Sequence, residues 1–276
     1  MNRQGKNGIG WTDYTWNPVV GCTKGCAYCY ARRQAKRQKH NCQWCYDFVP
    51  HLHMERLQDK GLRSKKPRKV FLGSMGELFD PDMELVVRKG RHLVGPSQRV
   101  VGCVLRACAA HPQHTFQILT KRPDRAAKFV FPPNVWLGTS IANQADADER
   151  IPQLLECKAA VRFVSYEPMH GPVDFTFVID KPGVRGLDVL GGRKYAYMGK
   201  DAGKPTYEEM VGHHTDTIDW LILGAETGNR KGRIVPERWW VNAAINTARD
   251  AGVDVFVKLN IVTISPEFAG IQEFPA

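Results

Sequence analysis

Three cysteines lie close together near the start of the chain, at Cys22, Cys26 and Cys29, with the spacing C-x3-C-x2-C. Their odd number and short separations argue against a disulfide framework. Structural zinc sites take four ligands, usually as two separate pairs. An iron–sulfur cluster, in contrast, can take three cysteines from one loop and leave one iron open. The spacing is therefore compatible with such a cluster, whose open iron could bind a substrate or cofactor. Half of a zinc site and three buried thiols are the alternatives.

A second cysteine pair follows at Cys42 and Cys45, with His51 and His53 close behind. These side chains are compatible with a Cys2His2 zinc site, an auxiliary cluster site or a redox dithiol. The interval from Cys45 to His51 is, however, much shorter than in familiar zinc modules. We therefore favour two free thiols beside a packed Trp44 over a second metal at Cys42 and Cys45.

The composition limits the classes of protein to consider. The 276 residues, 43% of them hydrophobic, are enough for one large domain, residues 1–276, with a well-buried core. The polar start and the lack of a long apolar run predict neither a signal peptide nor a membrane span, and hence a cytoplasmic protein. The 8 cysteines then indicate a reducing compartment, where thiols bind metals or stay free.

The formal net charge of +11 predicts an anionic partner such as nucleic acid, a nucleotide or a phosphorylated substrate. The early basic residues form two groups, which are Arg32, Arg33, Lys36, Arg37 and Lys39, and then Arg63, Lys65, Lys66, Arg68 and Lys69. Trp44 and Tyr46 lie between these groups and are suited to stack on a base. The sequence therefore suggests a track for a polyanion, with solvated lysines and core aromatics as the alternative.

Short apolar segments alternate with helix-compatible ones along the chain. The predicted strands are 17–22, 69–74, 115–120, 134–140, 161–166, 219–224 and 253–258. The predicted helices are 31–38, 83–94, 125–129, 146–157 and 237–251. This alternation indicates an α/β fold of repeated βαβ units with mainly parallel strands, either a barrel or an open partial barrel. Residues 174–217, rich in glycine and without clear periodicity, are predicted to be an irregular insertion that acts as a lid or is a surface excursion.

The cysteine motif, with Tyr28 before Cys29, resembles that of the radical S-adenosylmethionine superfamily. Further stretches resemble a phage- and prokaryote-associated family within it that carries a domain-of-unknown-function name. These stretches are Trp11-Thr-Asp-Tyr-Thr-Trp-Asn-Pro18, Tyr30-Ala31, His53-Met-Glu-Arg-Leu57, Gly73-Ser-Met-Gly-Glu-Leu-Phe79, Leu119-Thr-Lys-Arg-Pro123 and Gly224-Ala-Glu-Thr-Gly228, so the resemblance covers nearly the whole chain.

The resemblance implies a partial (β/α)6-type, TIM-like barrel. It also implies that Cys22, Cys26 and Cys29 hold a [4Fe-4S] cluster whose fourth iron chelates S-adenosylmethionine. In the superfamily, an electron from the cluster, delivered by a donor such as flavodoxin or ferredoxin, cleaves this cofactor to methionine and a 5′-deoxyadenosyl radical. That radical takes a hydrogen from the substrate. The resemblance further places the protein in the cytoplasm of a prokaryote or a phage-infected cell.

In barrels of parallel strands the site lies at the carboxyl ends of the strands. The residues found there in this sequence are mostly polar: Ser74, Gly76, Glu77, Lys121, Arg122, Thr139, Ser140, Asn143, Glu167, Glu226 and Lys258. The resemblance implies that the segment ending in Glu77 receives the amino group of S-adenosylmethionine, although Met75 departs from the usual glycine pair. Lys121 and Arg122 suit the cofactor carboxylate or a substrate phosphate. Thr139, Ser140 and Asn143 suit the ribose hydroxyls.

These observations predict a radical enzyme that acts on a nucleic-acid base or a nucleotide. One alternative is a radical enzyme acting on a peptide or small metabolite, and another is a non-enzymatic, zinc-containing protein that binds nucleic acid. The sequence assigns no catalytic residue, product or oligomeric state.

Overall fold

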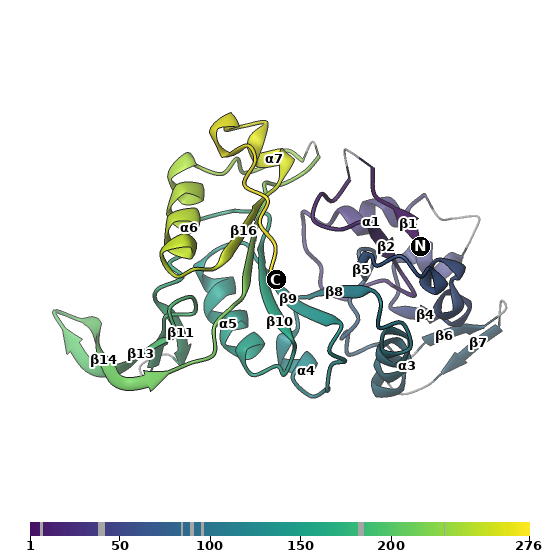
Figure 1. Cartoon of the computed structure of the whole chain (residues 1–276), viewed down its shortest axis with the longest axis horizontal. Helices are drawn as coiled ribbons and strands as arrows, with labels where there is room; N and C mark the ends of the chain where they lie inside the picture. Colours follow the sequence, from purple (N-terminus) through teal and green to yellow (C-terminus); the bar gives the residue numbers. More distant parts are fainter. Residues whose placement is uncertain are drawn as a thin grey trace.

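The computed structural model describes residues 1–5, 8–37, 42–83, 85–88, 91–94, 97–181, 185–228 and 230–276 (Figure 1). The end of the predicted helix 31–38, together with Lys39, lies outside the described residues, and so do residues 182–184 of the predicted insertion. None of the helices in the described ranges combines the length and hydrophobicity that crossing a bilayer requires.

The centre of the fold is a sheet of 8 strands in the order β1-β2-β5-β8-β9-β10-β15-β16. Its strands are β1 Asn2–Arg3, β2 Tyr14–Trp16, β5 Lys69–Leu72, β8 Thr115–Thr120, β9 Val135–Ile141, β10 Val161–Tyr166, β15 Trp220–Leu223 and β16 Asp254–Val257. Only the β1–β2 pair is antiparallel. Among the described residues β1 and β16 are the edges of this sheet. The predicted α/β class with mainly parallel strands is therefore confirmed.

The six predicted strands from residue 69 onward coincide with β5, β8, β9, β10, β15 and β16. The prediction for the first strand was wrong in its place: β2 enters the large sheet, whereas β3 Val19–Val20 pairs antiparallel with β4 His51–His53. The helix predicted over 83–94 was also wrong. There β6 Leu85–Arg88 and β7 Arg91–Val94 form an antiparallel pair next to β4, because backbone pairing with β4 overrides local helix propensity.

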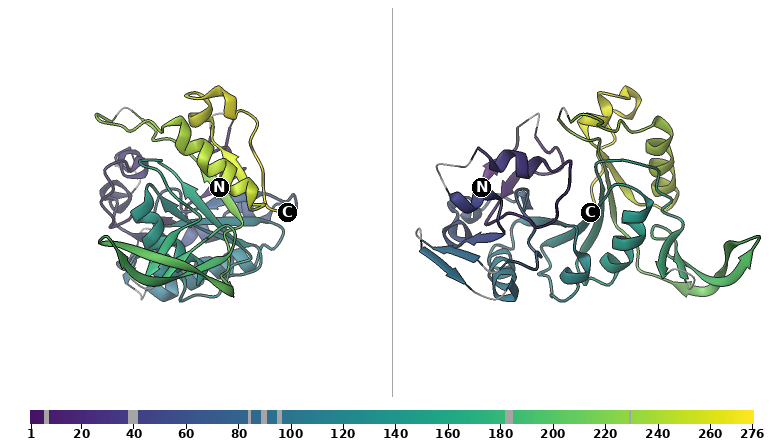
Figure 2. Two further views of the ribbon diagram at one scale, coloured as in Figure 1. Left: turned by 90° about the vertical axis from the view of Figure 1, so that its left-hand side faces the viewer. Right: turned by 180° about the vertical axis from the view of Figure 1, so that it is seen from behind.

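The helices are α1 Tyr30–Ala35, α2 Gln43–Asp47, α3 Ser97–Ala109, α4 Pro123–Ala126, α5 Gln144–Leu155, α6 Arg238–Asp250 and α7 Leu259–Val262. Short 3-10 helices span Met54–Gln58, Lys60–Arg63 and Pro266–Phe268. The helices α5 and α6 cover the same outer face of the sheet, where their apolar residues join the main core (Figures 1 and 2). The other face carries a second cluster that is mostly aromatic, made of Trp11, Phe71, Phe163, Trp220, Ile222 and Phe256.

The segment predicted to be an irregular insertion is mostly regular. It forms a four-stranded antiparallel sheet of β11 Val178–Lys181, β12 Arg185–Leu187, β13 Arg193–Asp201 and β14 Lys204–His214. Aromatic contacts across the strands hold it together, with the Phe177 ring 4.8 Å from Tyr207 and 5.4 Å from Tyr195 between centroids. The β13–β14 hairpin projects from the rest of the chain, as Figure 1 and the right-hand view of Figure 2 show.

Candidate functional site

A cavity of about 610 Å³ lies where the cysteine loop meets the carboxyl ends of the parallel strands. Its lining includes all three loop cysteines, Cys22, Cys26 and Cys29. It also includes residues at or just after strand ends, namely Asn17, Ser74, Gly76, Glu77, Lys121, Ser140, Glu167, Glu226 and Lys258. Residues far apart in sequence thus converge on one cavity of the size of a small-molecule site.

The cysteine loop is joined to the segment after β5 by backbone pairing at Gly21. The Gly21 N–H donates to the Met75 carbonyl at 3.0 Å, and the Glu77 N–H donates to the Gly21 carbonyl at 3.0 Å. Neither Gly21 nor Gly76 has room for a side chain. A Cβ on Gly21, whose φ is +93°, would lie 2.2 Å from the Val49 carbonyl oxygen, and one on Gly76 would lie 2.9 Å from the Gly21 carbonyl oxygen. The segment that ends in Glu77 is therefore fixed beside Cys22.

Glu77 is 6% exposed and accepts three hydrogen bonds from the protein. Its Oε1 accepts from the Thr120 hydroxyl at 2.6 Å and from the Phe79 N–H at 3.1 Å, and its Oε2 accepts from the Lys121 N–H at 2.9 Å. Burial raises the pKa of this carboxyl, against the opposing effect of these donors. Glu77 thus ties the segment after β5 to the end of β8. A carboxylate has about four acceptor positions, so one position remains for a ligand.

Lys121 places a cation against the cysteine loop. Its Nζ donates to the Tyr28 hydroxyl at 2.5 Å, lies 4.4 Å from the centre of that ring and is 3.7 Å from the Cys26 sulfur. The Lys24 Nζ in turn donates to the Lys121 carbonyl at 3.1 Å. A nearby cation favours the thiolate form of cysteine, which is the form that binds metal.

Backbone N–H groups also point at the loop sulfurs. Cys29 is the N-cap of α1 and its sulfur accepts from the Arg32 N–H at 3.4 Å, while the Cys22 sulfur accepts from the Lys24 N–H at 3.3 Å. Burial, followed by the charge of Glu77, nevertheless raises the pKa of Cys22 to about 12.

The residues that the sequence places at the end of β9 differ in their position relative to the cavity. Ser140 lines the cavity. Thr139 is fully buried and its hydroxyl donates to the Thr120 carbonyl at 3.0 Å, and the cavity lining does not include it. Asn143 is the N-cap of α5, where its side chain accepts from the Asp146 N–H at 3.0 Å. Both residues therefore serve the fold, and of these three only Ser140 contributes to the cavity wall.

Two ion pairs occupy the ends of β10, β15 and β16. Lys258 donates to Glu167 at 2.6 Å, which joins the ends of the last and third-last strands of the sheet. Glu226 accepts from Arg230 at 2.6 Å and lies 3.0 Å from the Nε2 atom of His170. Hydrogen bonding from Arg230 is the main cause that lowers the pKa of Glu226 to about 2.

Sequence reasoning did not assign His170 and Tyr30 to the site. The His170 ring lies edge-on to Tyr28, with centroids 5.2 Å apart. The Tyr30 hydroxyl donates to the Ser74 carbonyl at 2.5 Å, and Tyr30 lines the cavity. Their positions, just after β10 and just after Cys29, are the signal in the sequence that could have identified them.

A comparison with family models matches residues 6–260 to "Protein of unknown function (DUF5131)". The chain belongs to the DUF5131 family. No curated protein and no solved structure matches it.

The two basic groups of this DUF5131 protein differ in position. In α1, Arg32 donates to the Cys22 carbonyl at 2.8 Å and Arg33 donates to the Thr227 carbonyl at 3.3 Å, both beside the cavity. The run 63–69 leads into the amino end of β5, whereas Ser74 follows its carboxyl end. We therefore associate only the α1 group with the cysteine loop.

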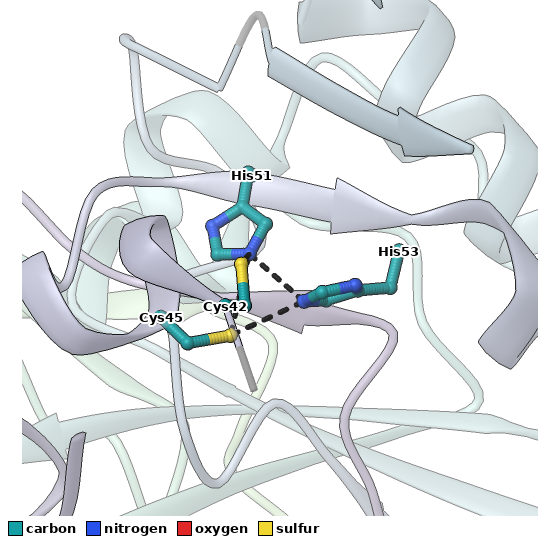
Figure 3. Close-up of side chains that lie close together, drawn as sticks. All are labelled: Cys42, Cys45, His51 and His53. Atoms are coloured by element: carbon teal, nitrogen blue, oxygen red, sulfur yellow. Dashed lines mark hydrogen bonds between the residues drawn. The ribbon is translucent and has the colours of Figure 1, made fainter. Parts of the chain in front are cut away.

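The second cysteine pair of this DUF5131 protein is gathered with two histidines. The ligand atoms of Cys42, Cys45, His51 and His53 all lie within 4.8 Å of one another, and all but Cys42 are buried (Figure 3). Both thiols are free of disulfides, and the group is arranged so that it could hold a metal ion. The short interval from Cys45 to His51 suffices because α2 and β4 are adjacent elements. Trp44 packs its ring edge-on to His51, at 5.8 Å between centroids.

Proposed function

We propose that this protein is a radical S-adenosylmethionine enzyme, with a [4Fe-4S] cluster on Cys22, Cys26 and Cys29. One observation carries the proposal: all three cysteines line one cavity together with residues at the carboxyl ends of the parallel strands. When bound, the cluster and S-adenosylmethionine would supply a one-electron cleavage that generates a radical able to abstract hydrogen. The sequential order of the parallel strands supports a partial (β/α)6-type barrel as the scaffold.

The donor set fits a cluster better than a single ion. Among the described residues, only the Cys42 group has three or more donors gathered as a single ion requires. In a cluster, each cysteine binds a different iron, so the sulfurs lie farther apart than around one ion. The loop cysteines form no such close group, and their surroundings supply the cation of Lys121 and two N–H groups that face sulfur.

Side chains of both charges lie around the proposed cluster site. Glu77 retains acceptor capacity for the ammonium group of S-adenosylmethionine. Lys121, whose Nζ lies 3.7 Å from the Cys26 sulfur, supplies a cation for its carboxylate. The Ser140 hydroxyl suits a ribose. Glu167 and Lys258, at the ends of β10 and β16, form an ion pair. Each of these side chains could instead bind a polar group of the substrate. Substrate hydrogen abstraction also requires the exclusion of water, which the aromatic cluster on this face of the sheet favours.

The substrate class rests on charge. Arg32 and Arg33 of α1 lie beside the cavity in a chain of net charge +11, which favours a nucleotide or nucleic-acid substrate over a peptide or a neutral metabolite. The reductant would be a small electron carrier such as flavodoxin or ferredoxin.

The test is anaerobic reconstitution with iron and sulfide, followed by reduction in the presence of S-adenosylmethionine. We expect about four iron atoms per chain and formation of methionine and 5′-deoxyadenosine. Cys26→Ala should lose the iron and the cleavage. Cys103→Ser, a thiol on α3 outside both cysteine groups, is the matched control and should retain both. Transfer of deuterium from candidate substrates into 5′-deoxyadenosine then identifies the substrate. Wild-type protein that binds no iron after reconstitution would refute the proposal.

A further inference from the structure

We propose that Cys42, Cys45, His51 and His53 bind one structural zinc ion, and that this ion fixes the wall on which the Cys22–Cys29 loop is built. This site is separate from the proposed radical site and its evidence is independent of it.

The local fold brings the four donors to one point. Cys42 immediately precedes α2 and Cys45 lies within it, so the C-x2-C spacing places both sulfurs on one side of a single helical turn. His51 and His53 are alternate residues of β4 and therefore share one face of that strand. Figure 3 shows the two rings and the two thiols directed toward a common centre.

The distances between donors suit tetrahedral coordination. Bond lengths of about 2.3 Å to sulfur and about 2.0–2.1 Å to nitrogen imply donor–donor separations of roughly 3.3–3.8 Å in a tetrahedron. The Cys45 sulfur lies 3.5 Å from His51 Nε2 and 3.2 Å from His53 Nε2, and the Cys42 sulfur lies 3.8 Å from His51 Nε2. The two Nε2 atoms are 2.9 Å apart. These four separations lie within about half an ångström of the tetrahedral values, and all four donor atoms lie within 4.8 Å of one another.

The hydrogen bonds of the two rings select the tautomer that a metal needs. His51 Nδ1 lies 2.7 Å from the Val49 carbonyl oxygen, which can only accept, so this nitrogen carries the proton. His53 Nδ1 lies 3.1 Å from a Glu55 carboxylate oxygen and is a donor for the same reason. Each ring can then present its Nε2 lone pair to the shared centre, which is what two histidine ligands of one metal ion require. The Glu55–His53 contact is the carboxylate–histidine arrangement that supports metal ligands.

The donor set points to zinc. Two thiolates and two imidazoles in a tetrahedral arrangement are typical of structural zinc. A dinuclear cluster with cysteines on one iron and histidines on the other would hold the two pairs farther apart than the 4.8 Å limit within which all four donors lie here. Two thiolates also neutralise the charge of the ion, which suits a buried site.

The same elements support the cysteine loop. The β3 strand leads directly into Gly21 and Cys22, and it pairs with β4 through Val20 and His51. At the end of α2, the Phe48 carbonyl accepts from the Cys22 N–H at 3.3 Å, and the Phe48 ring packs with α1 and Cys29. An ion that clamps α2 to β4 therefore holds both walls of the loop.

The experiment is to purify the protein without chelators and to measure zinc and iron per chain by mass spectrometry. We expect about one zinc ion per wild-type chain, and its loss in Cys42→Ser and Cys45→Ser. Cys26→Ala and the control Cys103→Ser should keep the zinc. Cobalt added to the metal-free wild type should produce the intense visible absorption of tetrahedral cobalt with thiolate ligands. Zinc retention in Cys26→Ala makes the outcome independent of the proposed radical site.

A milder variant covers the case in which the cysteine variants fail to fold. Glu55→Gln keeps all four ligands, and we expect its zinc affinity, measured by competition with a chromophoric chelator, to fall about 10–100-fold. Glu156→Gln, an exposed carboxylate at the end of α5, is the matched control and should bind as wild type. Wild-type protein without zinc and without the cobalt absorption overturns the proposal. So does zinc that remains in both cysteine variants, or iron in place of zinc at these ligands.

Discussion

Replacing Glu77 tests how the cavity wall is held together. Its carboxylate is the common acceptor for the Thr120 hydroxyl and for the N–H groups of Phe79 and Lys121. Glu77→Ala leaves three buried donors without their acceptor and opens a cavity, so we expect a loss of roughly 3–5 kcal/mol in the free energy of unfolding. Glu77→Gln keeps one oxygen but turns an amide NH2 toward a donor, and we expect a loss of about 1–3 kcal/mol.

Urea denaturation followed by circular dichroism measures these losses, and the sign of their pH dependence follows from the raised pKa of Glu77. In the folded protein the carboxyl binds its proton more tightly than the ordinary value of 4.5 allows, because burial outweighs the three donors. The stabilisation by protonated Glu77 is therefore fully present below the unfolded pKa and is lost as the pH rises through the folded pKa. Glutamine does not titrate, so the stability gap between wild type and Glu77→Gln should narrow as the pH rises from acid to neutral.

Two results would refute this reasoning. If the difference in unfolding free energy between wild type and Glu77→Gln widens as the pH rises, the donors hold Glu77 ionised, against the effect of burial. A loss below about 0.5 kcal/mol, the range expected for an exposed site such as the control Glu156→Gln, would mean that the three hydrogen bonds do not support the fold. Binding of S-adenosylmethionine to folded Glu77→Gln is a separate measurement, and a fall of about tenfold to a hundredfold is expected if Glu77 receives the ammonium group.

Three further changes test the surroundings of the loop. Gly21→Ala, which places a Cβ 2.2 Å from the Val49 carbonyl oxygen at a φ of +93°, should cost about 3 kcal/mol or more in urea denaturation, and near-wild-type stability would contradict the close packing. Lys121→Met should keep bound iron but weaken S-adenosylmethionine binding about tenfold, and unchanged affinity in a titration would remove Lys121 from the cofactor site. Arg33→Glu should lower the slope of log affinity against log salt for single-stranded nucleic acid by about one or more. Absence of salt-dependent binding in the wild type would exclude a polyanionic substrate.

The sequence predicted the sheet from residue 69 onward because each parallel strand is an apolar run with polar residues at its end. It misplaced the first strand because Val19 and Val20 are the more typical strand formers, whereas the sheet takes the short segment Tyr14–Trp16. The strands β6 and β7 were missed because β4, with which β6 pairs, lies more than thirty residues earlier in the chain. Nonlocal pairing of this kind leaves no periodic signal within the segment itself.

The insertion was predicted to be irregular because of its glycines and prolines. Its regularity comes from pairing between β13 and β14, in which Tyr197 lies opposite Tyr207. The alternation of Tyr195 and Tyr197 was a strand signal that the glycine content outweighed in our interpretation. Cross-strand aromatic contacts of this kind form only once the partner strand is in place.

A position near the end of a strand brings a residue close to the cavity but does not decide whether its side chain lines it. Ser140 and Thr139 are neighbours in β9, so their side chains point to opposite faces, and only the face of Ser140 borders the cavity. Composition cannot distinguish two adjacent hydroxyls, whereas the parity of the strand can.

The geometry of the Cys42 group depends on a tight turn between α2 and β4. Cys45 and His51 seemed too close in sequence for a metal site because familiar modules place a longer segment between the ligand pairs. Here α2 ends at Phe48, whose left-handed backbone, with a φ of 60°, turns the chain directly into β4. A turn this tight lets five intervening residues suffice, since the helix and the strand then face each other across the donors. A single backbone conformation at Phe48 therefore both brings the histidines to the cysteines and presents the carbonyl that receives the Cys22 N–H.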